Sequence, residues 1–225
     1  MNVIQLDTNT KKLQNAEYNY WVFENALHKE TCQQIINLGK NKWQEGEIQR
    51  NVISEKTVNQ QSRKSDVAWS NEEWLYEICW DYINTANINS KWNFKVDSCE
   101  LMQITRYKTN GHYDFHQDGN GFTKYNMPNN KFLHGRTRKL SMTVVLNEDY
   151  EGGEFELLSG INRHDSEFTK EELKGEGYLK TQSVPLPHFK DKGSALFFPS
   201  FSWHRVKPVT KGIRRALVVW FRGPK

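Results

Sequence analysis

Apolar residues at helical spacing predict two helices in the first ninety residues. From Lys29 to about Trp43 the apolar residues Cys32, Ile35, Ile36 and Trp43 follow helical spacing, although Gly39 weakens the middle of this segment. The second segment is clearer, because Ser70 can serve as its N-cap and Glu73 completes a capping box. Its apolar stripe consists of Trp74, Leu75, Ile78, Cys79, Tyr82, Ile83 and Ala86. We expect this stripe to pack into the core.

Short β-prone runs between turn signals predict strands over much of the remaining chain. The expected strands cover residues 18–23, 94–107, 140–146, 155–158, 194–198 and 214–221. The segments between them are polar or rich in turn residues: 45–67, 119–137, the turn 147–153, and the charged connection 159–192, where 170–174 could form a short helix. Many short strands with glycine-rich turns fit a mainly β protein with flanking helices, built as a two-sheet jelly roll.

Alternation along two of these strands separates an apolar face from a mixed one. If Tyr107 points inward, the residues on its side of the strand are Leu101, Gln103 and Thr105. Buried polar side chains suit a wet cavity better than a dry core. On the last strand, the residues that share a face with Arg214 are Ala216, Val218 and Trp220. We expect Arg214 to point inward, where a guanidinium needs an anionic partner.

The length and composition of the chain suit one globular domain. Its 225 residues can bury a sizeable core, and a hydrophobic content of 36% with eight tryptophans argues against disorder. We expect a single domain over residues 1–225, in which 1–93 support a β core formed by 94–225. Cys32, Cys79 and Cys99 lack the spacing of a disulfide framework or a zinc site, so a reducing compartment is the simpler expectation.

Charge and hydropathy narrow the range of partners. The formal charge of +4 is mild and the lysines are scattered, so nucleic acid is not the expected partner. No charged and then apolar leader opens the sequence, and no apolar run approaches the roughly 18 residues of a membrane span. We therefore expect a cytoplasmic protein that does not enter a membrane. The oligomeric state has no signature in the sequence.

Two histidines and an aspartate have a spacing typical of a metal site. His116 and Asp118 are two residues apart, so both side chains leave the same face of an extended backbone. His204 lies 88 residues after His116 and ten residues before Arg214. Two imidazoles and one carboxylate form the facial triad of non-haem Fe(II) oxygenases, although Mn(II), Co(II) or Zn(II) would also suit these ligands.

Other histidines compete for this role. His112 and Asp114 have the same spacing as His116 and Asp118, so spacing alone does not choose between the two pairs. The histidines in the turn-rich and charged segments are expected to be exposed or structural, and these are His134, His164 and His188. A wider pattern favours the pair formed by His116 and Asp118.

This wider pattern resembles the motif of the iron(II)/2-oxoglutarate-dependent oxygenases of the prolyl 4-hydroxylase-like superfamily, especially the small single-domain microbial and viral members. The residues that carry it are Tyr107, Tyr113, His116, Asp118, His204, Pro208, Val209, Gly212 and Arg214. The segments YEGGEF at 150–155 and GSALFFPSFSWHRV at 193–206 are also similar, and the resemblance extends from Arg63 to Trp220. It implies a double-stranded β-helix with the N-terminal helices packed on one sheet, and a triad that binds Fe(II).

The resemblance also implies roles for residues around the triad. Arg214 would bind the distal carboxylate of 2-oxoglutarate, since its planar fork stays charged when buried and matches a carboxylate. Some members of the family carry an assisting tyrosine on the strand that corresponds to residues 140–146, and this chain has none there. The candidates to assist Arg214 are therefore Tyr107, Tyr113, Gln103 and Thr143.

Three further positions are expected to line the pocket. Val218 and Trp220 would form an apolar wall, although core packing explains Trp220 equally well. Arg63 could contact the substrate or be a surface charge. The segment 45–67 is expected to be a surface loop, and the family resemblance adds the alternative of a lid over the substrate.

The implied reaction hydroxylates a C–H bond and is coupled to the oxidative decarboxylation of 2-oxoglutarate to succinate and carbon dioxide, with O2 as oxidant and ascorbate as a reductant. The first candidate substrate is a prolyl residue in an extended peptide or protein segment. The same chemistry on a small molecule or free amino acid is the alternative. Nucleic-acid demethylation is disfavoured, because demethylases of this type often carry an arginine where this chain has Trp220. A jelly roll that binds a ligand without turnover is the non-enzymatic alternative.

Overall fold

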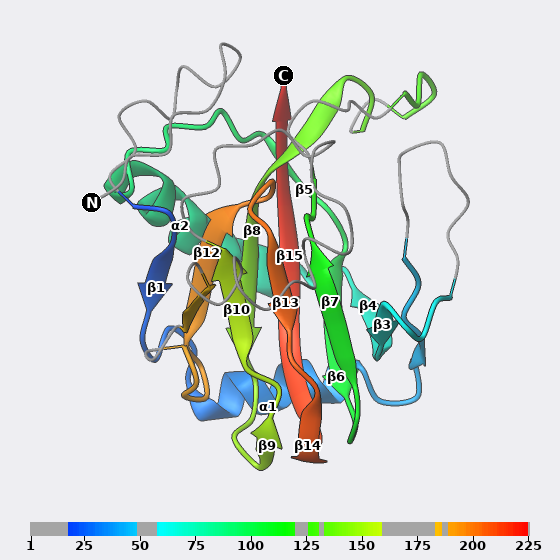
Figure 1. The fold of residues 1–225 in the computed structure, drawn as a ribbon. Helices are drawn as coiled ribbons and strands as arrows, with labels where there is room; N and C mark the ends of the chain where they lie inside the picture. The colour runs from blue at the N-terminus through cyan, green and yellow to red at the C-terminus, as the bar shows by residue number, and fades with distance from the viewer. Residues whose placement is uncertain are drawn as a thin grey trace.

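The computed structural model describes residues 18–48, 58–119, 126–130, 133–158, 183–185 and 189–224. Within these ranges two helices, α1 (Lys29–Leu38) and α2 (Glu73–Asn89), accompany antiparallel β-sheets (Figure 1). The larger sheet has the strand order β1 (Trp21–Phe23), β12 (Ala195–Pro199), β8 (Arg136–Val145), β15 (Arg214–Pro224), β6 (Met102–Tyr107), β4 (Asp66–Ser70) and β2 (Gln44–Glu45), with β5 (Ser98–Cys99) paired to β15.

The smaller sheet lies over one face of the larger one. Its strand order is β11 (Ser183–Pro185), β10 (Phe155–Leu158), β13 (His204–Val206), β7 (His112–His116) and β3 (Arg63–Lys64). A separate ribbon joins β14 (Val209–Gly212) to β9 (Tyr150–Gly152) at the end of the sheets that is lowest in Figure 1. This mainly β architecture of two sheets with flanking helices is the jelly roll that the sequence predicts.

The helices cover the outer face of the larger sheet. Leu75, Cys79 and Ile83 from α2 are fully buried in one apolar cluster with residues from β6 and β15. These sheet residues are Met102, Ile104, Leu217, Val219 and Phe221. Burial of such side chains contributes about 1.5–3 kcal/mol each, so this layer is a main source of stability. It confirms the predicted apolar stripe and places both helices on one sheet, behind the strands in Figure 1.

The inner faces of the two sheets enclose a second, smaller cluster. Most of its members come from the two sheets, joined by Phe189 and by Val209 of β14, and the cluster consists of Tyr107, Val145, Phe155, Leu157, Phe189, Leu196, Phe198, Val206 and Val209. Gln103 and Thr105 are buried on the same face of β6 as Tyr107. The face of β6 and β15 that packs on the helices is therefore apolar, whereas the inward face is mixed and turns Gln103 and Thr105 into the space between the sheets, as the alternation along these strands predicts.

Two predicted boundaries are wrong for identifiable reasons. The first helix ends at Leu38 rather than near Trp43, because the Trp43 ring folds back so closely on Gly39 that a Cβ there would lie 2.9 Å from it. Ser70 is not an N-cap but the last residue of β4, where it pairs with Met102. The N-cap of α2 is Glu72, whose side chain makes no capping bond. Pairing with a neighbouring strand outweighed the local capping signal.

The polar segment 45–67 and the strand predicted over 94–107 also need correction. The first segment contains β3 and the start of β4. They form strands because β3 pairs with β7 and β4 pairs with β6. The second is divided into β5 and β6, and Leu101 between them is 53% exposed rather than inward. The possible helix at 170–174 and the histidines at 164 and 188 lie outside the described residues.

Neither of the described helices is long and apolar enough to pass through a bilayer.

Gly193 provides a test of this packing. Its φ is +92°, and a Cβ would lie 2.1 Å from the Leu27 carbonyl oxygen, whereas Gly135 at φ +74° has nothing within 4 Å of a Cβ. Both alanine variants incur the left-handed backbone cost of about 1–2 kcal/mol. Gly193→Ala adds a clash and should lose more than about 3 kcal/mol of unfolding free energy. Urea unfolding measures both, and equal losses would contradict the described contact with Leu27.

Candidate metal centre

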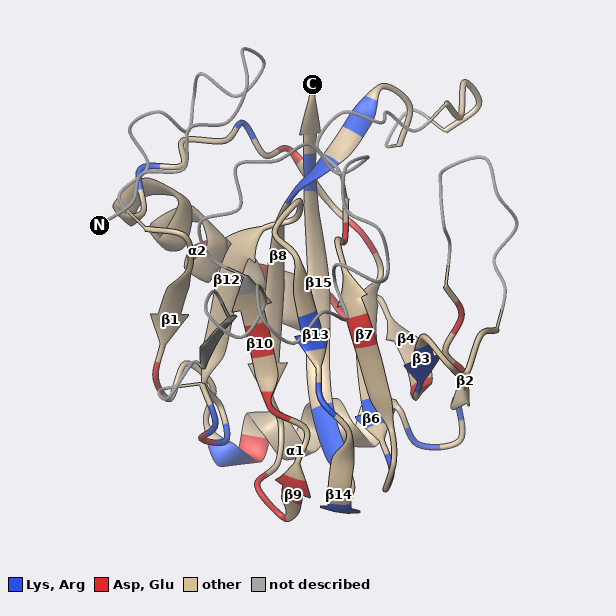
Figure 2. Ribbon diagram, in the orientation of Figure 1, with Lys and Arg blue, Asp and Glu red and all other residues tan. Residues whose placement is uncertain are grey.

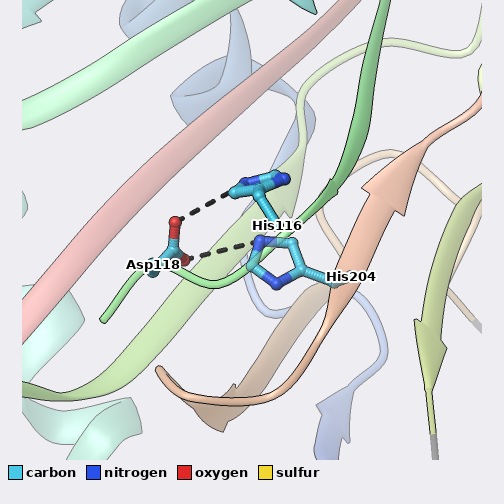
Figure 3. A group of neighbouring side chains, drawn as sticks. All are labelled: His116, Asp118 and His204. Atoms are coloured by element: carbon cyan, nitrogen blue, oxygen red, sulfur yellow. Dashed lines mark ion pairs between the residues drawn. The ribbon is translucent and has the colours of Figure 1, made fainter. Parts of the chain in front are cut away.

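Three side chains from two adjacent strands converge between the sheets. His116 ends β7, Asp118 follows two residues later, and His204 begins β13 directly opposite His116 in the strand register. Their possible ligand atoms all lie within 4.8 Å of one another. Figure 3 shows both imidazoles turned toward the carboxylate, with His116 Nε2 3.8 Å from Asp118 Oδ1 and His204 Nε2 3.6 Å from Oδ2.

Hydrogen bonds fix the orientation of both imidazoles. His116 Nδ1 lies 2.8 Å from the Asp114 carbonyl oxygen, and His204 Nδ1 lies 2.9 Å from that of Ser202. Because a carbonyl can only accept, each Nδ1 donates a proton, and in a neutral ring Nε2 then carries a lone pair. Both lone pairs therefore point at a carboxylate. A bound cation would remove the repulsion among these three groups.

The burial of the cluster favours this protonation state. Burial, together with the neighbouring His204, lowers the pKa of His116 to about 3, so the His116 imidazole is neutral at pH 7. Burial opposes the charged form of Asp118, but His204, His116 and Arg138 outweigh it and lower the pKa of this carboxyl. A neutral imidazole beside a carboxylate is a ligand set for a divalent transition metal.

The competing pair does not join the cluster. Asp114 is exposed, and the ring nitrogens of His112 lie 3.2 Å from the Asn110 carbonyl oxygen and 3.1 Å from that of Gln61. His134 is exposed. Within the described ranges, the cluster of His116, Asp118 and His204 is thus the group of candidate ligands that the fold assembles.

A buried arginine stands beside the cluster. Arg214 begins β15, is 2% exposed and pairs with Tyr107, whose ring centre is 5.6 Å from the guanidinium carbon. The Asn147 side chain holds the backbone on both sides of it, donating to the Ile213 carbonyl oxygen at 2.7 Å and accepting from the Arg215 N–H at 2.7 Å. Gly153, at φ +68°, makes room, since a Cβ there would lie 2.9 Å from Arg214 Cδ.

Arg214 has no anionic partner in the described part of the chain. Its Nε is buried without a hydrogen bond, and no described carboxylate pairs with it. A buried, unpaired cation is costly, and removal of this cost by an anion provides binding free energy. The residues present therefore fit a divalent metal together with an anion such as the dicarboxylate 2-oxoglutarate.

Buried Tyr107 and half-buried Tyr113 complete the wall of this space. Burial raises the pKa of Tyr107 despite the opposing influence of Arg63 and Arg214, and burial raises that of Tyr113 to about 12. Both phenols therefore remain protonated donors. The Tyr113 ring stacks on His116, with ring centres 3.5 Å apart. Gln103 lies on the same face as Tyr107 and donates to Thr105 Oγ1 at 2.7 Å.

The remaining predicted pocket residues have different surroundings. Trp220 is 7% exposed and packs against Trp69 with ring centres 6.2 Å apart, while Val218 on the same face is half-buried. Arg63 is 6% exposed, and its guanidinium lies 4.7 Å from the centre of the Tyr113 ring. The interpretation of Arg63 as a surface charge is therefore wrong.

Arg138 is a residue of this centre that the sequence did not reveal. From β8 its Nη1 donates to the Asp118 carbonyl oxygen at 2.9 Å, while Nε and Nη2 each donate to a different Glu100 oxygen at 2.7 Å. Its guanidinium also lies 4.1 Å from the centre of the Trp220 ring. The Arg138 side chain thus links the backbone of Asp118, a candidate ligand, to the carboxylate of Glu100. These partners are far apart in sequence, and no motif signals them.

We expect Arg138→Gln to weaken Mn(II) binding by about 10–100-fold, because residues that orient metal ligands typically contribute this much. Arg136→Gln is the matched control, since Arg136 on the same strand pairs with Asp97 at 2.8 Å away from the cluster. Arg138→Lys should be intermediate, because a lysine cannot form the two-pronged contact with Glu100. Titration of Mn(II) by calorimetry measures all three, and equal losses in both glutamine variants would refute the positioning role.

Comparison with known proteins agrees with this geometry. The model of the 2OG-Fe(II) oxygenase superfamily matches residues 102–222, which include the candidate triad and Arg214. A PKHD-type hydroxylase of Alteromonas mediterranea is 39% identical over 85 residues, which are 37% of this chain and 28% of that protein. A PKHD-type hydroxylase of Xylella fastidiosa is 31% identical over 120 residues, 52% of this chain and 42% of that protein. The chain thus spans less than half the length of these relatives.

Solved structures of prolyl hydroxylases share the fold over almost the whole chain. One from Trichoplax adhaerens, in complex with a hypoxia inducible factor peptide fragment, has a TM-score of 0.62 at 17% identity and covers 95% of this chain and 87% of its own. A Pseudomonas putida prolyl-4-hydroxylase has a TM-score of 0.59 at 14% identity, with coverage of 93% and 95%. At these identities the likeness establishes the fold alone.

The family assignment rests on the matched segment, which is more than half of the chain. The family implies Fe(II) and 2-oxoglutarate with O2, and both the candidate triad and the unpaired Arg214 fit them. From this match and this geometry, the chain belongs to the 2OG-Fe(II) oxygenase superfamily.

Proposed function

We propose that this protein is a 2-oxoglutarate-dependent hydroxylase that acts on a prolyl residue in a peptide or protein. The observation that carries the oxygenase chemistry is the buried Arg214, without an anionic partner among the described residues, beside a cluster of two histidines and one aspartate. A triad alone would suit hydrolysis as well as oxidation, because its ligand types do not select the metal. The adjacent anion site adds the requirement for a cosubstrate that carries a carboxylate.

In this proposal, His116, Asp118 and His204 hold Fe(II), and Arg214 binds the distal carboxylate of 2-oxoglutarate. When bound, the iron and its cosubstrate supply the oxidation of the C–H bond, and ascorbate serves as a reductant. The protein orients these groups and excludes water. The protonated phenols of Tyr107 and Tyr113 donate hydrogen bonds near the cosubstrate, and Val218 and Trp220 form an apolar boundary.

Two lines of support favour a prolyl substrate in a polypeptide. The two solved structures described above share this fold at nearly this length and are prolyl hydroxylases, and one of them is in complex with a peptide fragment. The curated relatives are also named as hydroxylases. Charge gives no competing support for nucleic acid, since Figure 2 shows acidic and basic positions side by side on the smaller sheet, where Arg205 on β13 pairs with Glu156 on β10 at 2.6 Å.

The proposed reaction predicts succinate production that proline-containing peptides stimulate. Purified protein is supplied with Fe(II), 2-oxoglutarate and ascorbate, and succinate and peptide mass are measured. His204→Ala should abolish turnover because it removes a ligand, whereas His112→Ala should retain it because His112 lies outside the cluster. Stimulation by small molecules but by no peptide would refute the polypeptide substrate. A fully active His204→Ala variant would refute the ligand assignment.

Arg214→Gln should weaken 2-oxoglutarate binding by about 10–100-fold, since hydrogen bonds to charged groups contribute about 1.5–3 kcal/mol. The matched control is Arg215→Gln, because Arg215 is the next residue of β15 and points to the other face. Calorimetric titration of 2-oxoglutarate into Mn(II)-loaded protein separates this effect from turnover. Equal affinities in Arg214→Gln and the unmodified protein would place the cosubstrate elsewhere.

A further inference from the structure

Two of the three buried arginines in the described ranges have no carboxylate partner. Arg222 is 4% exposed, and its Nε lies 3.4 Å from Glu100 Oε1. Arg63 and Arg214 are buried to a similar degree, and neither pairs with a described carboxylate. Buried cations without an anion are costly, so each of the two unpaired arginines marks a place where an anion would stabilise the protein. In the proposed function, 2-oxoglutarate supplies the anion for Arg214, and no group supplies one for Arg63.

Arg63 faces the same centre as Arg214 but from the smaller sheet. It lies on β3 directly opposite Tyr113 of β7, and its guanidinium is 4.7 Å from the centre of that ring. The Tyr113 ring in turn stacks on His116. The positive charge of Arg63 also lowers the pKa values of Tyr107, Tyr113 and His116, although burial is the dominant influence on all three. One aromatic ring therefore separates Arg63 from the candidate triad.

The groups that hold Arg63 are all neutral. Its Nε donates to Ser65 Oγ at 2.8 Å, and its Nη1 donates to the Glu47 carbonyl oxygen at 3.0 Å. Its Nη2 is buried and has no hydrogen-bond partner. Gly46 leaves room for the guanidinium, since a Cβ at that position would lie 2.8 Å from Arg63 Nε. These contacts fix the direction of the side chain and leave the guanidinium without an anion and one donor nitrogen without a partner.

A count of formal charges shows that 2-oxoglutarate does not compensate Arg63. In the loaded centre of the proposed function, Fe(II) and the dianionic cosubstrate cancel each other. The carboxylate of Asp118 cancels the guanidinium of Arg214. The charge of Arg63 is left over on a side chain that is 6% exposed, where electrostatic attraction is several times stronger than at the surface. The loaded enzyme therefore retains an attraction for one more anionic group.

We propose that Arg63 recognises a carboxylate of the substrate. The proposal rests on the proposed function and narrows its substrate class to prolyl peptides with an acidic residue beside the target. The Tyr113 ring between Arg63 and the triad sets the two apart, so the carboxylate belongs to a neighbouring residue rather than to the residue that is hydroxylated.

The test compares peptides that differ in one charge. Two proline-containing peptides, one with Glu and one with Gln next to the proline, are titrated into protein loaded with Mn(II) and 2-oxoglutarate. The Mn(II)-loaded protein binds peptide without turnover. We expect the Glu peptide to bind about 10-fold more tightly, as is typical of a charge-assisted contact. Arg63→Gln should abolish this preference, Arg63→Lys should retain part of it, and Lys64→Gln should leave it unchanged, because Lys64 is the exposed neighbour on the same strand.

Three outcomes decide the matter, with circular dichroism and Mn(II) affinity showing that each variant is folded. An undiminished preference for the Glu peptide in Arg63→Gln would overturn the proposal. A loss of 2-oxoglutarate affinity in that variant, without a change in peptide preference, would assign the guanidinium to the cosubstrate and also overturn it. If neither peptide binds but a free amino acid is preferred over its amide through Arg63, the polypeptide substrate fails while carboxylate recognition by Arg63 stands.

Discussion

The pairing of β13 with β7 is the constraint on which the rest of the centre depends. It places His204 opposite His116, although the two are separated by 88 residues, and it brings both imidazoles to a carboxylate that follows β7. A shift of one residue would turn one imidazole to the other face of the sheet, because side chains alternate along a strand. The backbone carbonyls of Asp114 and Ser202 then fix each ring by its Nδ1. The geometry of the candidate ligands is therefore a property of the sheet before any metal binds.

The inner face of the larger sheet supplies a positive charge, the guanidinium of Arg214. Strand alternation directs Leu217 and Val219 to the helices and Arg214 to the space between the sheets, so a single register determines both the core and the anion site. The apolar layer against α2 is a main source of stability and offsets the cost of burying the guanidinium. The space between the sheets is left with the positive charge of Arg214, and an anion bound there would compensate it. The unpaired guanidinium thus lowers the stability of the free protein and raises its affinity for an anion.

The two sheets also divide the supporting roles. Arg138 from the larger sheet contacts Glu100, the Asp118 backbone and the Trp220 ring, so one side chain connects a candidate ligand to the apolar wall. Arg63 from the smaller sheet is supported by neutral groups only. The paired arginine is therefore suited to hold the centre in position, and the unpaired one to bind a group that arrives from outside.

Local pattern in the sequence was sufficient for the fold class, the apolar stripe of α2 and the inward direction of Arg214, because hydrophobic periodicity is a property of neighbouring residues. It could not choose between His112 with Asp114 and His116 with Asp118 by spacing, and only family resemblance favoured the second pair. The tertiary structure separated them by exposing Asp114 and by setting His204 opposite His116. It also buried Arg63, joined Arg138 to Glu100 and made Ser70 the end of a strand rather than a cap. The physical reason is that these features depend on which distant strands pair and in which register. Long-range contacts determine this pairing, and the local sequence pattern does not.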